Sequence, residues 1–488
     1  MIKMKYIYDT TEIHNYKQEL KKMIIDNDKD FPVSIIERVD LDNYLNKVME
    51  LGRIILAVED LKVAGCILFY SNNSKTKIGY ISLLCVDKSY RKMGIATQLI
   101  NKCHTEMRRL GMEYCELSTD EKNNRSINLY LKHGFNVLKK NDGILQMRKS
   151  LININILLTS VGRRGYLVQY FKIALNDLGK VYASNSEYTS SFTFADGYTI
   201  SPLIYDEKYI DFLINYCKEN SIKMIVSLFD IDLYVLAKNK EKFKKEGITV
   251  VVSDEDFIKT CNDKWLTYQY LTQNGINTPK SFLSIEQVLL EVKDGHISFP
   301  LIVKPRWGMG SLGIYCAENV DELKIFYSKI KNDILQSYLK YESQQDLENC
   351  VIIQEKICGQ EYGCDIINDL DGCYQSTIIR KKIAMRAGET DSAEIVNNTD
   401  ILEITKKLAN ISNHIGNLDI DIIENSGTYH LLEMNARFGG GYPFSHIAGV
   451  DLPLAILKWY LNEPVDKNIL EACVGTVGQK DFVITKIK

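Results

Sequence analysis

Several residues that suit nucleotide chemistry lie close together in the second half of the chain. A strand-like segment ends in Lys304, and a glycine-rich loop follows it. A lysine can bind the α- and β-phosphates of a nucleoside triphosphate, and backbone N–H groups of such a loop can bind the β- and γ-phosphates. The loop residues expected to do so are Gly308, Gly310, Ser311 and Gly313. A hairpin turn with an incidental lysine is the alternative for this segment alone.

Two other segments add groups that a nucleotide needs. Asp263 and Lys264 begin a predicted helix and place a second cation 40 residues before Lys304. Residues 352–362 predict a strand whose end carries Glu355 and Glu361, six positions apart. This pair suits the edge of an adenine ring and a ribose.

A further pair of predicted strands supplies oxygen ligands for a metal. The first strand carries Asp421, and the second carries Glu433 and Asn435. The last two share one face because side chains along a strand alternate with a period of two. Carboxylate and amide oxygens are hard ligands that suit Mg²⁺, which bridges nucleotide phosphates.

These elements, in this order, resemble the ATP-grasp superfamily over about residues 153–470. The ending E-x-N-x-R-F-G-G-G-Y-P, residues 433–443, resembles that of its carbamoyl-phosphate-synthase-like ligases. The resemblance implies that Lys264 and Lys304 contact ATP phosphates, Glu355, Lys356 and Ile357 line the adenine pocket, Glu361 holds the ribose, Asp421, Glu433 and Asn435 bind Mg²⁺ (or Mn²⁺), and Arg437 stabilises the transferred phosphoryl group and an acyl-phosphate.

The chain departs from the family pattern at two positions. Ala436 stands where the family often has proline, and Asp419 competes with Asp421 as the first metal ligand. We favour Asp421 because its spacing to Glu433 fits the usual hairpin. Because there is one ATP-grasp unit and no glutaminase segment, the resemblance implies ligation of a small-molecule carboxylate to an amine rather than carbamoyl phosphate synthesis.

A basic run at residues 380–390 places four cations beside Gly388. We expect a substrate loop in which Arg386 faces a carboxylate and acts as a catalytic residue. A solvated basic turn is the alternative. The glycines from Gly439 to Gly441 are expected to shape the amine or acyl pocket.

The first 150 residues contain a second phosphate-binding pattern. A predicted strand, residues 78–86, leads through Arg91, Lys92 and Gly94 into an amphipathic helix. A glycine turn at a helix N-terminus directs backbone N–H groups and the positive end of the helix dipole to one spot, where a pyrophosphate can bind. An ordinary turn before a helix is the alternative.

Further along, the run from Asn123 to Tyr130 leads into Gly134 and Phe135. Together with the turn, it resembles the GNAT acetyltransferase family over about residues 1–150. The resemblance implies that acetyl-CoA donates an acetyl group to an amine. It also implies that Arg91, Lys92, Gly94, Ile95, Ala96 and Thr97 bind the pyrophosphate, Val86 and Asn123 contact the pantetheine arm, and Tyr130 is the general acid that protonates the leaving thiolate.

The predicted strand at residues 78–86 carries no carboxylate of the kind that family members often use to deprotonate the amine. Glu116 on the next strand, or a water relay, is the alternative base. A second interpretation of Tyr130 is a packed aromatic residue on an amphipathic helix.

The elements that must position these residues can be predicted from periodicity. Strands at 54–58, 63–70 and 78–86 form an antiparallel meander, and a strand at 113–118 follows the helix. Residues 154–165 are a buried strand that runs into a glycine turn and a helix at 166–178. Short strands at 224–228 and 250–252 continue this parallel unit.

The expected fold class is therefore a multidomain α/β and α+β protein. It comprises a GNAT fold with a mixed sheet at 1–150, a Rossmann-like pre-ATP-grasp unit at 153–260, a two-lobed ATP-grasp domain at 261–470, and a C-terminal tail at 471–488.

Composition excludes several other classes. The 488 residues are 45% hydrophobic and 25% charged, with a formal net charge of -3, which argues against a disordered chain, nucleic-acid binding and a polybasic membrane anchor. No apolar run approaches the ~20 residues that span a bilayer. Twelve cysteines without regular spacing, and no signal peptide, favour free thiols and a cytoplasmic location. Whether the protein is a homo-oligomer is left open.

The combined interpretation is a bifunctional enzyme that acts with both domains on one small molecule. Two alternatives remain. In the first, the GNAT domain binds acetyl-CoA as a non-catalytic sensor. In the second, the chain is a scaffold with a degenerate nucleotide site.

Overall fold

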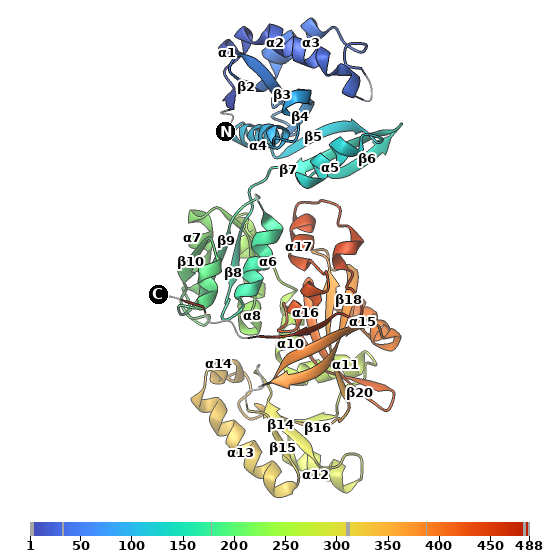
Figure 1. Ribbon diagram of the computed structural model, residues 1–488. Helices are drawn as coiled ribbons and strands as arrows, with labels where there is room; N and C mark the ends of the chain where they lie inside the picture. Colours follow the sequence, from blue (N-terminus) through green and yellow to red (C-terminus); the bar gives the residue numbers. More distant parts are fainter. Residues whose placement is uncertain are drawn as a thin grey trace. The chain divides into compact units, whose positions relative to one another are not determined.

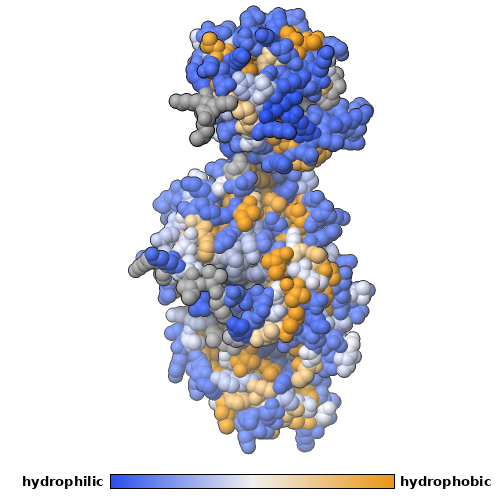
Figure 2. All heavy atoms as spheres, in the orientation of Figure 1, coloured by the Kyte–Doolittle hydropathy of each residue, from blue (hydrophilic) through white to orange (hydrophobic). Residues whose placement is uncertain are grey.

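The computed structural model describes residues 4–31, 34–176, 178–308, 313–386, 388–481 and 485–486. The chain divides into two compact units, Met1–Asn153 and Ile154–Lys488 (Figure 1). All twelve cysteines are free, as predicted. Within the described ranges, no helix is both long and apolar enough to cross a membrane. Hydrophilic residues cover most of the face seen in Figure 2, with apolar side chains scattered among them.

The first unit is a seven-stranded mixed sheet with helices on both faces. Its strands, in spatial order, are β1 (Lys5–Ile7), β2 (Arg53–Glu59), β3 (Lys62–Tyr70), β4 (Ile78–Val86), β5 (Tyr114–Asp120), β7 (Ile144–Ser150) and β6 (Asn136–Asn141). One face packs on α1 (Thr10–Asn15), α2 (Lys17–Asp26) and α3 (Leu41–Leu51), and the other on α4 (Ile95–Arg109) and α5 (Asn124–Lys132). The predicted antiparallel meander is confirmed as β2, β3 and β4.

Strands β4 and β5 are paired over only about half of their length. Their parallel pairing runs from Ile78–Tyr114 to Ile81–Leu117, although β4 continues to Val86 and β5 to Asp120. The unpaired ends leave an opening in the middle of the sheet. A ligand can enter there and hydrogen-bond to the strand backbone.

The second unit begins with a five-stranded parallel sheet. Its strands, in spatial order, are β10 (Gly197–Ile200), β9 (Val181–Asn185), β8 (Asn155–Thr159), β11 (Ile222–Ser227) and β12 (Thr249–Val251). Its helices are α6 (Gly165–Leu175), α7 (Tyr209–Glu219), α8 (Asp230–Lys238), α9 (Lys240–Lys245) and α10 (Glu255–Asn262). The predicted β-α-β opening is confirmed, although the helix expected to reach residue 178 ends at Leu175.

Two antiparallel sheets complete the second unit. The smaller contains β13 (Ser281–Phe282), β16 (Val351–Glu355), β14 (Leu301–Pro305) and β15 (Tyr315–Ala317), with α12 (Ile285–Lys293), α13 (Val320–Gln336) and α14 (Leu339–Ser343). The larger contains β21 (Thr428–Asn435), β20 (Gly416–Asn425), β17 (Gln360–Asn368), β18 (Tyr374–Arg386), β19 (Glu389–Val396) and β22 (Val477–Gln479). The remaining helices are α11 (Lys264–Gln273), α15 (Thr399–Ser412), α16 (Tyr442–Ile447) and α17 (Leu452–Tyr460).

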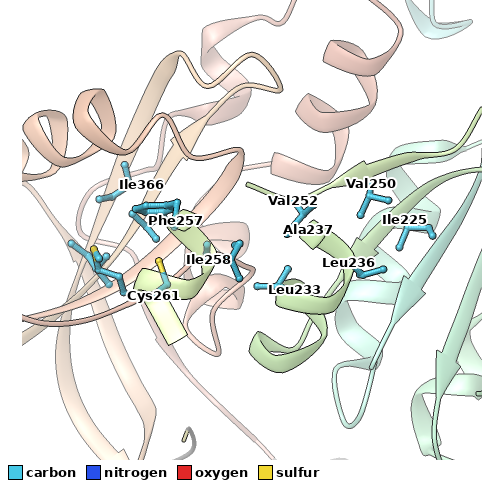
Figure 3. Packing of buried hydrophobic residues seen from close by; sticks show 14 of the residues in the cluster. Ile225, Leu233, Leu236, Ala237, Val250, Val252, Phe257, Ile258, Cys261 and Ile366 are labelled. Carbon is cyan, nitrogen blue, oxygen red and sulfur yellow. The ribbon is translucent and has the colours of Figure 1, made fainter. Parts of the chain in front are cut away.

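One hydrophobic core joins the parallel sheet to the six-stranded sheet. Figure 3 shows Ile225 and Val250 of the first sheet, Ile258 of α10 between the sheets, and Ile366 of the second. The four-stranded sheet packs on a separate core around Val303. Two bodies with separate cores can enclose a ligand where they meet.

A buried carboxylate, that of Asp232, hydrogen-bonds to side chains at the carboxyl ends of both β8 and β11. Asp232, which is fully buried, accepts hydrogen bonds from four hydroxyl groups at distances of 2.5–3.1 Å. The donors are Thr159, Ser160, Tyr209 and Ser227.

We expect Asp232→Ala to lower the stability of the second unit by about 3 kcal/mol, because it leaves buried hydroxyl groups without an acceptor. Asp211→Ala, which breaks an exposed pair with Lys242, is the control and should change stability by less than about 1 kcal/mol. Thermal unfolding of the two variants checks this prediction. Equal losses would show that the Asp232 network contributes no more than a surface ion pair.

Candidate functional site

A cavity of about 300 Å³ lies in the second unit between the β14 region and the six-stranded sheet. Its charged lining residues are Arg164, Asp230, Lys264, Lys304, Arg380, Lys382, Glu389, Asp419, Asp421, Glu433 and Arg437. Asn435, Gly308, Gly440 and Gly441 also line it. Most of the residues predicted to bind phosphate or metal therefore line this one cavity.

The two lysines expected to contact phosphates both line the cavity. Lys304 is the next-to-last residue of β14. Lys264 begins α11, where Asp263 caps the helix by accepting hydrogen bonds from two backbone N–H groups. The ammonium group of Lys264 donates to the carbonyl oxygen of Gly308 at 2.6 Å. Burial, followed by the charge of Lys264, lowers the pKa of Lys304 to about 8. A buried and a half-buried cation close together are stabilised by a polyanion such as a nucleoside triphosphate.

The opposite wall carries the predicted metal ligands. Asp421 on β20 lies directly across from Glu433 on β21, and Asn435 is two residues further on. The Asn435 amide nitrogen lies 3.4 Å from Glu433 Oε1. Although burial acts to raise it, the pKa of Glu433 is lowered because Lys264 and Lys304 are close. The lysines and the acidic wall therefore face one another across the same space.

This donor set fits Mg²⁺. Within the described part of the chain, no three His, Cys, Asp or Glu side chains cluster closely enough to hold a metal by themselves. Two carboxylates and one amide suffice for Mg²⁺, which keeps water and nucleotide phosphate oxygens among its six ligands. Lys382, whose ammonium group lies 2.8 Å from Asp421 Oδ1, balances part of the acidic charge.

Asp419, the competing metal ligand, has a different set of partners. Its carboxylate accepts from Arg380 at 3.0 Å and from Arg437 at 3.2 Å. Burial raises its pKa to about 6 in spite of both guanidinium groups. Arg437 is also paired with Asp230 at 3.1 Å, so two carboxylates hold its guanidinium at the cavity wall. The geometry favours Asp421, and leaves Asp419 to orient the arginines.

The glycine run after Arg437 allows Asp419 and Arg380 to approach the backbone. A Cβ atom at Gly439 would lie 2.2 Å from Asp419 Cγ, and one at Gly441 would lie 2.7 Å from Arg380 Nε. Contacts this short exclude any side chain. The run was expected to shape a substrate pocket, and Gly440 and Gly441 do line the cavity.

Arg386 does not lie where the sequence predicted. The basic run is not a loop, because it forms strand β18 up to Arg386 and pairs with β19. Arg386 pairs with Asp391 at 3.2 Å and is absent from the cavity lining, whereas Arg380 and Lys382 lie in it. Positions 380 and 382 share one face of β18, and two irregularities in its pairing with β19, between Lys382 and Met385, interrupt the alternation before Arg386.

The expected adenine and ribose residues lie outside the lining of the cavity. Glu355 ends β16, and the Lys356 ammonium group lies 3.4 Å from Cys316 Sγ. Ile357 is half-buried in the segment that follows β16. Glu361 connects to the cavity through Lys382, at 3.3 Å. Gly310 and Ser311 lie outside the described residues, while Gly308 and Gly313 have positive φ values that favour glycine.

A second cavity, of about 510 Å³, lies in the first unit where β4 and β5 separate. It brings together every residue expected to contact acetyl-CoA. These are Val86, Arg91, Lys92, Gly94, Ile95, Ala96, Thr97, Asn123 and Tyr130.

The N-terminus of α4 points its backbone donors at this cavity. Gly94 has a φ of 79° and precedes the helix, and no side chain caps the first turn. Arg91 is more constrained than expected, because its guanidinium donates to Asn27 at 2.8 Å and to Asp30 at 2.5 Å. Its Nε also donates to the Val86 carbonyl at 3.1 Å. Protein groups therefore occupy the Arg91 guanidinium, whereas no side chain caps the backbone N–H groups of the first turn of α4.

Tyr130 reaches the cavity from α5, whose N-terminus is capped by the side chain of Asn123. The ring is buried and packs edge-to-face on Phe135 at 5.7 Å. Burial raises the pKa of the phenol, so it stays protonated at neutral pH and can donate a proton. Glu116, the alternative base, accepts from Arg148 at 2.7 Å and from Gln146 at 2.7 Å and does not line the cavity.

Several lining residues were not predicted from the sequence. Arg164 follows the glycine turn after β8, and its guanidinium donates to the Leu228 and Phe438 carbonyls at 2.7 and 2.9 Å. Asp230 begins α8. A strand followed by a polar helix start is the signal that could have found both, because ligands bind at the carboxyl ends of parallel strands.

Comparison with known proteins assigns both units to families. Residues 21–135 match the acetyltransferase (GNAT) family, residues 156–251 the PylC-like N-terminal domain, and residues 261–441 the ATP-grasp domain. The chain therefore combines a GNAT domain with a PylC-like unit and an ATP-grasp domain, which confirms the resemblances and the fold class.

Relatives are similar over parts of the chain only. The carbamoyl phosphate synthase large chain of Clostridium beijerinckii is 26% identical over 220 residues, which is 43% of this chain and 19% of that protein. The large chain of Clostridium perfringens is 25% identical over 284 residues, 56% of this chain and 25% of that protein. The chain thus spans a quarter or less of the length of these relatives.

Solved structures share the fold of the second unit. L-amino acid ligase from Bacillus licheniformis matches with a TM-score of 0.52 and 18% identity, over 66% of this chain and 79% of that one. The biotin carboxylase domain of Hydrogenobacter thermophilus 2-oxoglutarate carboxylase, in complex with MgADP and bicarbonate, matches with a TM-score of 0.51 and 16% identity, over 64% and 70%.

Proposed function

We propose that the second unit is an ATP- and Mg²⁺-dependent ligase that activates a small-molecule carboxylate as an acyl-phosphate and joins it to an amine. One observation carries the proposal. Lys264 and Lys304 face Asp421, Glu433 and Asn435 across a single cavity. Cations for the nucleotide phosphates and ligands for their metal are thereby present together, with Arg437 beside them.

The reaction has two steps. A carboxylate oxygen of the acid attacks the γ-phosphorus of ATP, the bond to the β-phosphate oxygen breaks, and ADP leaves. The amine nitrogen then attacks the acyl carbon, the bond to phosphate breaks, phosphate leaves with the electron pair, and the nitrogen gives up a proton to solvent. Lys264 and Lys304 stabilise negative charge on the transferred phosphoryl group. Arg437, held by Asp230 and Asp419, binds the acyl-phosphate.

Mg²⁺ bound by Asp421, Glu433 and Asn435 would neutralise charge on the β- and γ-phosphates. Lys382 stays on Asp421 and orients that carboxylate. Lys304 is buried and Arg437 nearly so, which limits the access of water to the acyl-phosphate.

Release of ADP and phosphate tests this function. The full-length protein is incubated with ATP, Mg²⁺ and pooled carboxylic acids and amines, and products are identified by mass spectrometry. We expect ADP release that needs both an acid and an amine and yields a mass equal to their sum less water. ADP release without any condensed product would contradict ligation, and no ADP release with any pool would indicate a scaffold.

ATP binding should weaken above pH 8. Because Lys304 loses its proton as the pH rises through its pKa of about 8, the charge that attracts phosphate is lost on the alkaline side. We expect the Kd for ATP to rise about 10-fold between about pH 7 and pH 9, one pH unit past that pKa. In Lys304→Arg the rise should vanish, because arginine stays charged. An identical rise in both proteins would assign it to another group.

For the first unit, we propose that it binds acetyl-CoA and transfers the acetyl group to an amine. The amine nitrogen attacks the thioester carbonyl, the C–S bond breaks, and Tyr130 gives its proton to the leaving thiolate. The nitrogen gives up a proton to solvent, and Tyr130 regains one from solvent. The α4 N-terminus binds the pyrophosphate, and the separated end of β4 accepts the pantetheine arm. We also propose that the two domains act on the same small molecule. Their presence in one chain supports this.

Glu116→Gln should leave acetyl transfer within about 3-fold of the parent protein, because a carboxylate saturated by hydrogen bonds and outside the cavity makes a poor base. The measurement is thiol release from acetyl-CoA with pooled amines. A loss comparable to that of an essential base, about 100-fold or more, would show that Glu116 removes the proton from the amine.

A sensor function for the first unit is the second candidate. Among the described lining residues of its cavity, Asp30 is the sole carboxylate, and it is paired with Arg91 at 2.5 Å. A site without an available base favours binding over catalysis. Acetyl-CoA binding without thiol release, together with a change in ADP release on binding, would support this candidate.

A further inference from the structure

The C-terminal strand carries a lysine to the edge of the nucleotide cavity. Strand β22 pairs with β19, and Ser392 Oγ donates to the Gly478 carbonyl at 2.9 Å. The backbone N–H of Lys480 donates to the Asp391 carbonyl at 2.8 Å. A Cβ atom at Gly478 would lie 2.7 Å from Ile447 Cδ1, so the strand is closely packed on α16. These contacts fix the position from which the Lys480 side chain extends.

The Lys480 ammonium group forms an ion pair at this edge. It donates to Glu389 Oε2 at 3.0 Å, and Glu389 lines the cavity. It also lies 3.9 Å from the position of a Cβ atom on Gly440, a second lining residue. The Glu389 side chain is 71% exposed and that of Lys480 30% exposed, so a ligand in the cavity can reach both charges. Neither residue has a role in the nucleotide chemistry proposed above.

An acid and a base side by side match a ligand that carries both charges. When a ligand's ammonium group binds Glu389, the ion pair between Glu389 and Lys480 weakens. A carboxylate on the same ligand can then form an ion pair with Lys480. A simple amine that binds Glu389 has no carboxylate for Lys480, so less negative charge remains close to the Lys480 ammonium group than in the free protein. The matched ligand is an amino acid, and the discrimination comes from charge-assisted hydrogen bonds.

We propose that Glu389 and Lys480 bind the amine substrate as an amino-acid zwitterion, Glu389 through the ammonium group and Lys480 through the carboxylate. The proposal rests on the ligase function proposed above. It makes Lys480, which follows a strand outside the matched ATP-grasp segment at 261–441, a specificity-determining residue.

The test compares amino acids with the amines that lack their carboxylate. ADP release by the full-length protein is measured with ATP, Mg²⁺ and pooled carboxylic acids, and with glycine against methylamine, alanine against ethylamine, and phenylalanine against phenethylamine. We expect at least one amino acid to have a kcat/KM at least about 10-fold above that of its partner amine, the effect of one charge-assisted hydrogen bond.

Three variants test whether the preference for amino acids over amines depends on Lys480. Lys480→Met should raise KM for the amino acid about 10-fold or more and leave kcat within about 3-fold. KM for the partner amine should not rise, and it should fall if the lysine competes with the amine for Glu389. Lys480→Arg should restore most of the preference. Ser392→Ala is the matched control: it removes a hydrogen bond that fastens β22 and leaves both charges in place, so it should keep the preference.

Each other outcome overturns the inference. Equal use of amino acids and amines by the parent protein excludes zwitterion recognition while leaving the ligase intact. If Lys480→Met and Ser392→Ala change both kinds of substrate alike, the ion pair only fastens the strand. If no acid and amine support ADP release, the ligase function itself fails, and the inference fails with it.

Discussion

Lys304→Met is expected to lower kcat/KM for ATP about 10²–10³-fold in the ligation assay, the effect of removing one preorganised charge from a phosphoryl-transfer site. Lys304 is buried at the end of β14, and methionine fills a similar volume without the charge. The loss should appear in both kcat and KM, because the lysine contacts phosphates before and during transfer. Thermal unfolding should change little, since a buried charge with a lowered pKa is removed.

Lys324→Met is the matched control for this variant. Lys324 is exposed on α13 in the same lobe and lies outside the lining of the cavity. We expect its kcat/KM to equal that of the parent protein. Equal activity of Lys304→Met and Lys324→Met would show that Lys304 does not contact the nucleotide.

Tyr130→Phe is expected to reduce acetyl transfer about 100-fold, the typical contribution of a general acid. The phenol is buried in the cavity proposed to bind acetyl-CoA and keeps its proton at neutral pH, because burial raises its pKa. Binding of acetyl-CoA should change by less than about 3-fold, since the pyrophosphate site at α4 is untouched. Thiol release and a binding isotherm on the same protein separate the two effects.

Tyr114→Phe serves as the control, because Tyr114 lies on β5 in the same unit and does not line the cavity. It should behave as the parent protein. Unchanged transfer in Tyr130→Phe would indicate that the thiolate is protonated by another route. No transfer in the parent protein would favour a sensor.

The local structure of two motifs was predicted correctly from the sequence. The hairpin β20–β21 brings Asp421 opposite Glu433 because alternation and strand length follow from local sequence. The glycine turn before α4 was found for the same reason, since a positive φ at Gly94 and a helix start are local properties.

Contacts between distant segments could not be predicted in this way. Arg91 carries the pattern of a phosphate ligand, yet Asn27 and Asp30, about 60 positions earlier, bind its guanidinium. Arg386 was expected to be the substrate arginine because it lies near Gly388, but irregular pairing of β18 with β19 interrupts the strand alternation before Arg386, and Arg380 and Lys382 line the cavity instead. In both cases, contacts with distant or neighbouring segments of the folded chain determine where the arginine side chain lies.

The C-terminal segment illustrates the same limit. Residues 471–488 have no strong period and were expected to form a tail, but Val477–Gln479 adds a strand to the edge of the six-stranded sheet. Three residues are too few for a periodic signal. The packing of Gly478 on α16 and the pairing with β19 define this strand only in the folded protein.

The most direct test of acyl-phosphate ligation is the fate of the oxygen atoms of the substrate carboxylate. The acid that supports ADP release is labelled with ¹⁸O in its carboxylate and turned over with ATP, Mg²⁺ and the amine, and the phosphate is analysed by mass spectrometry. If the carboxylate attacks the γ-phosphorus and the amine then displaces phosphate, one ¹⁸O atom per turnover appears in inorganic phosphate. Unlabelled phosphate, or AMP and pyrophosphate in place of ADP and phosphate, would contradict the mechanism.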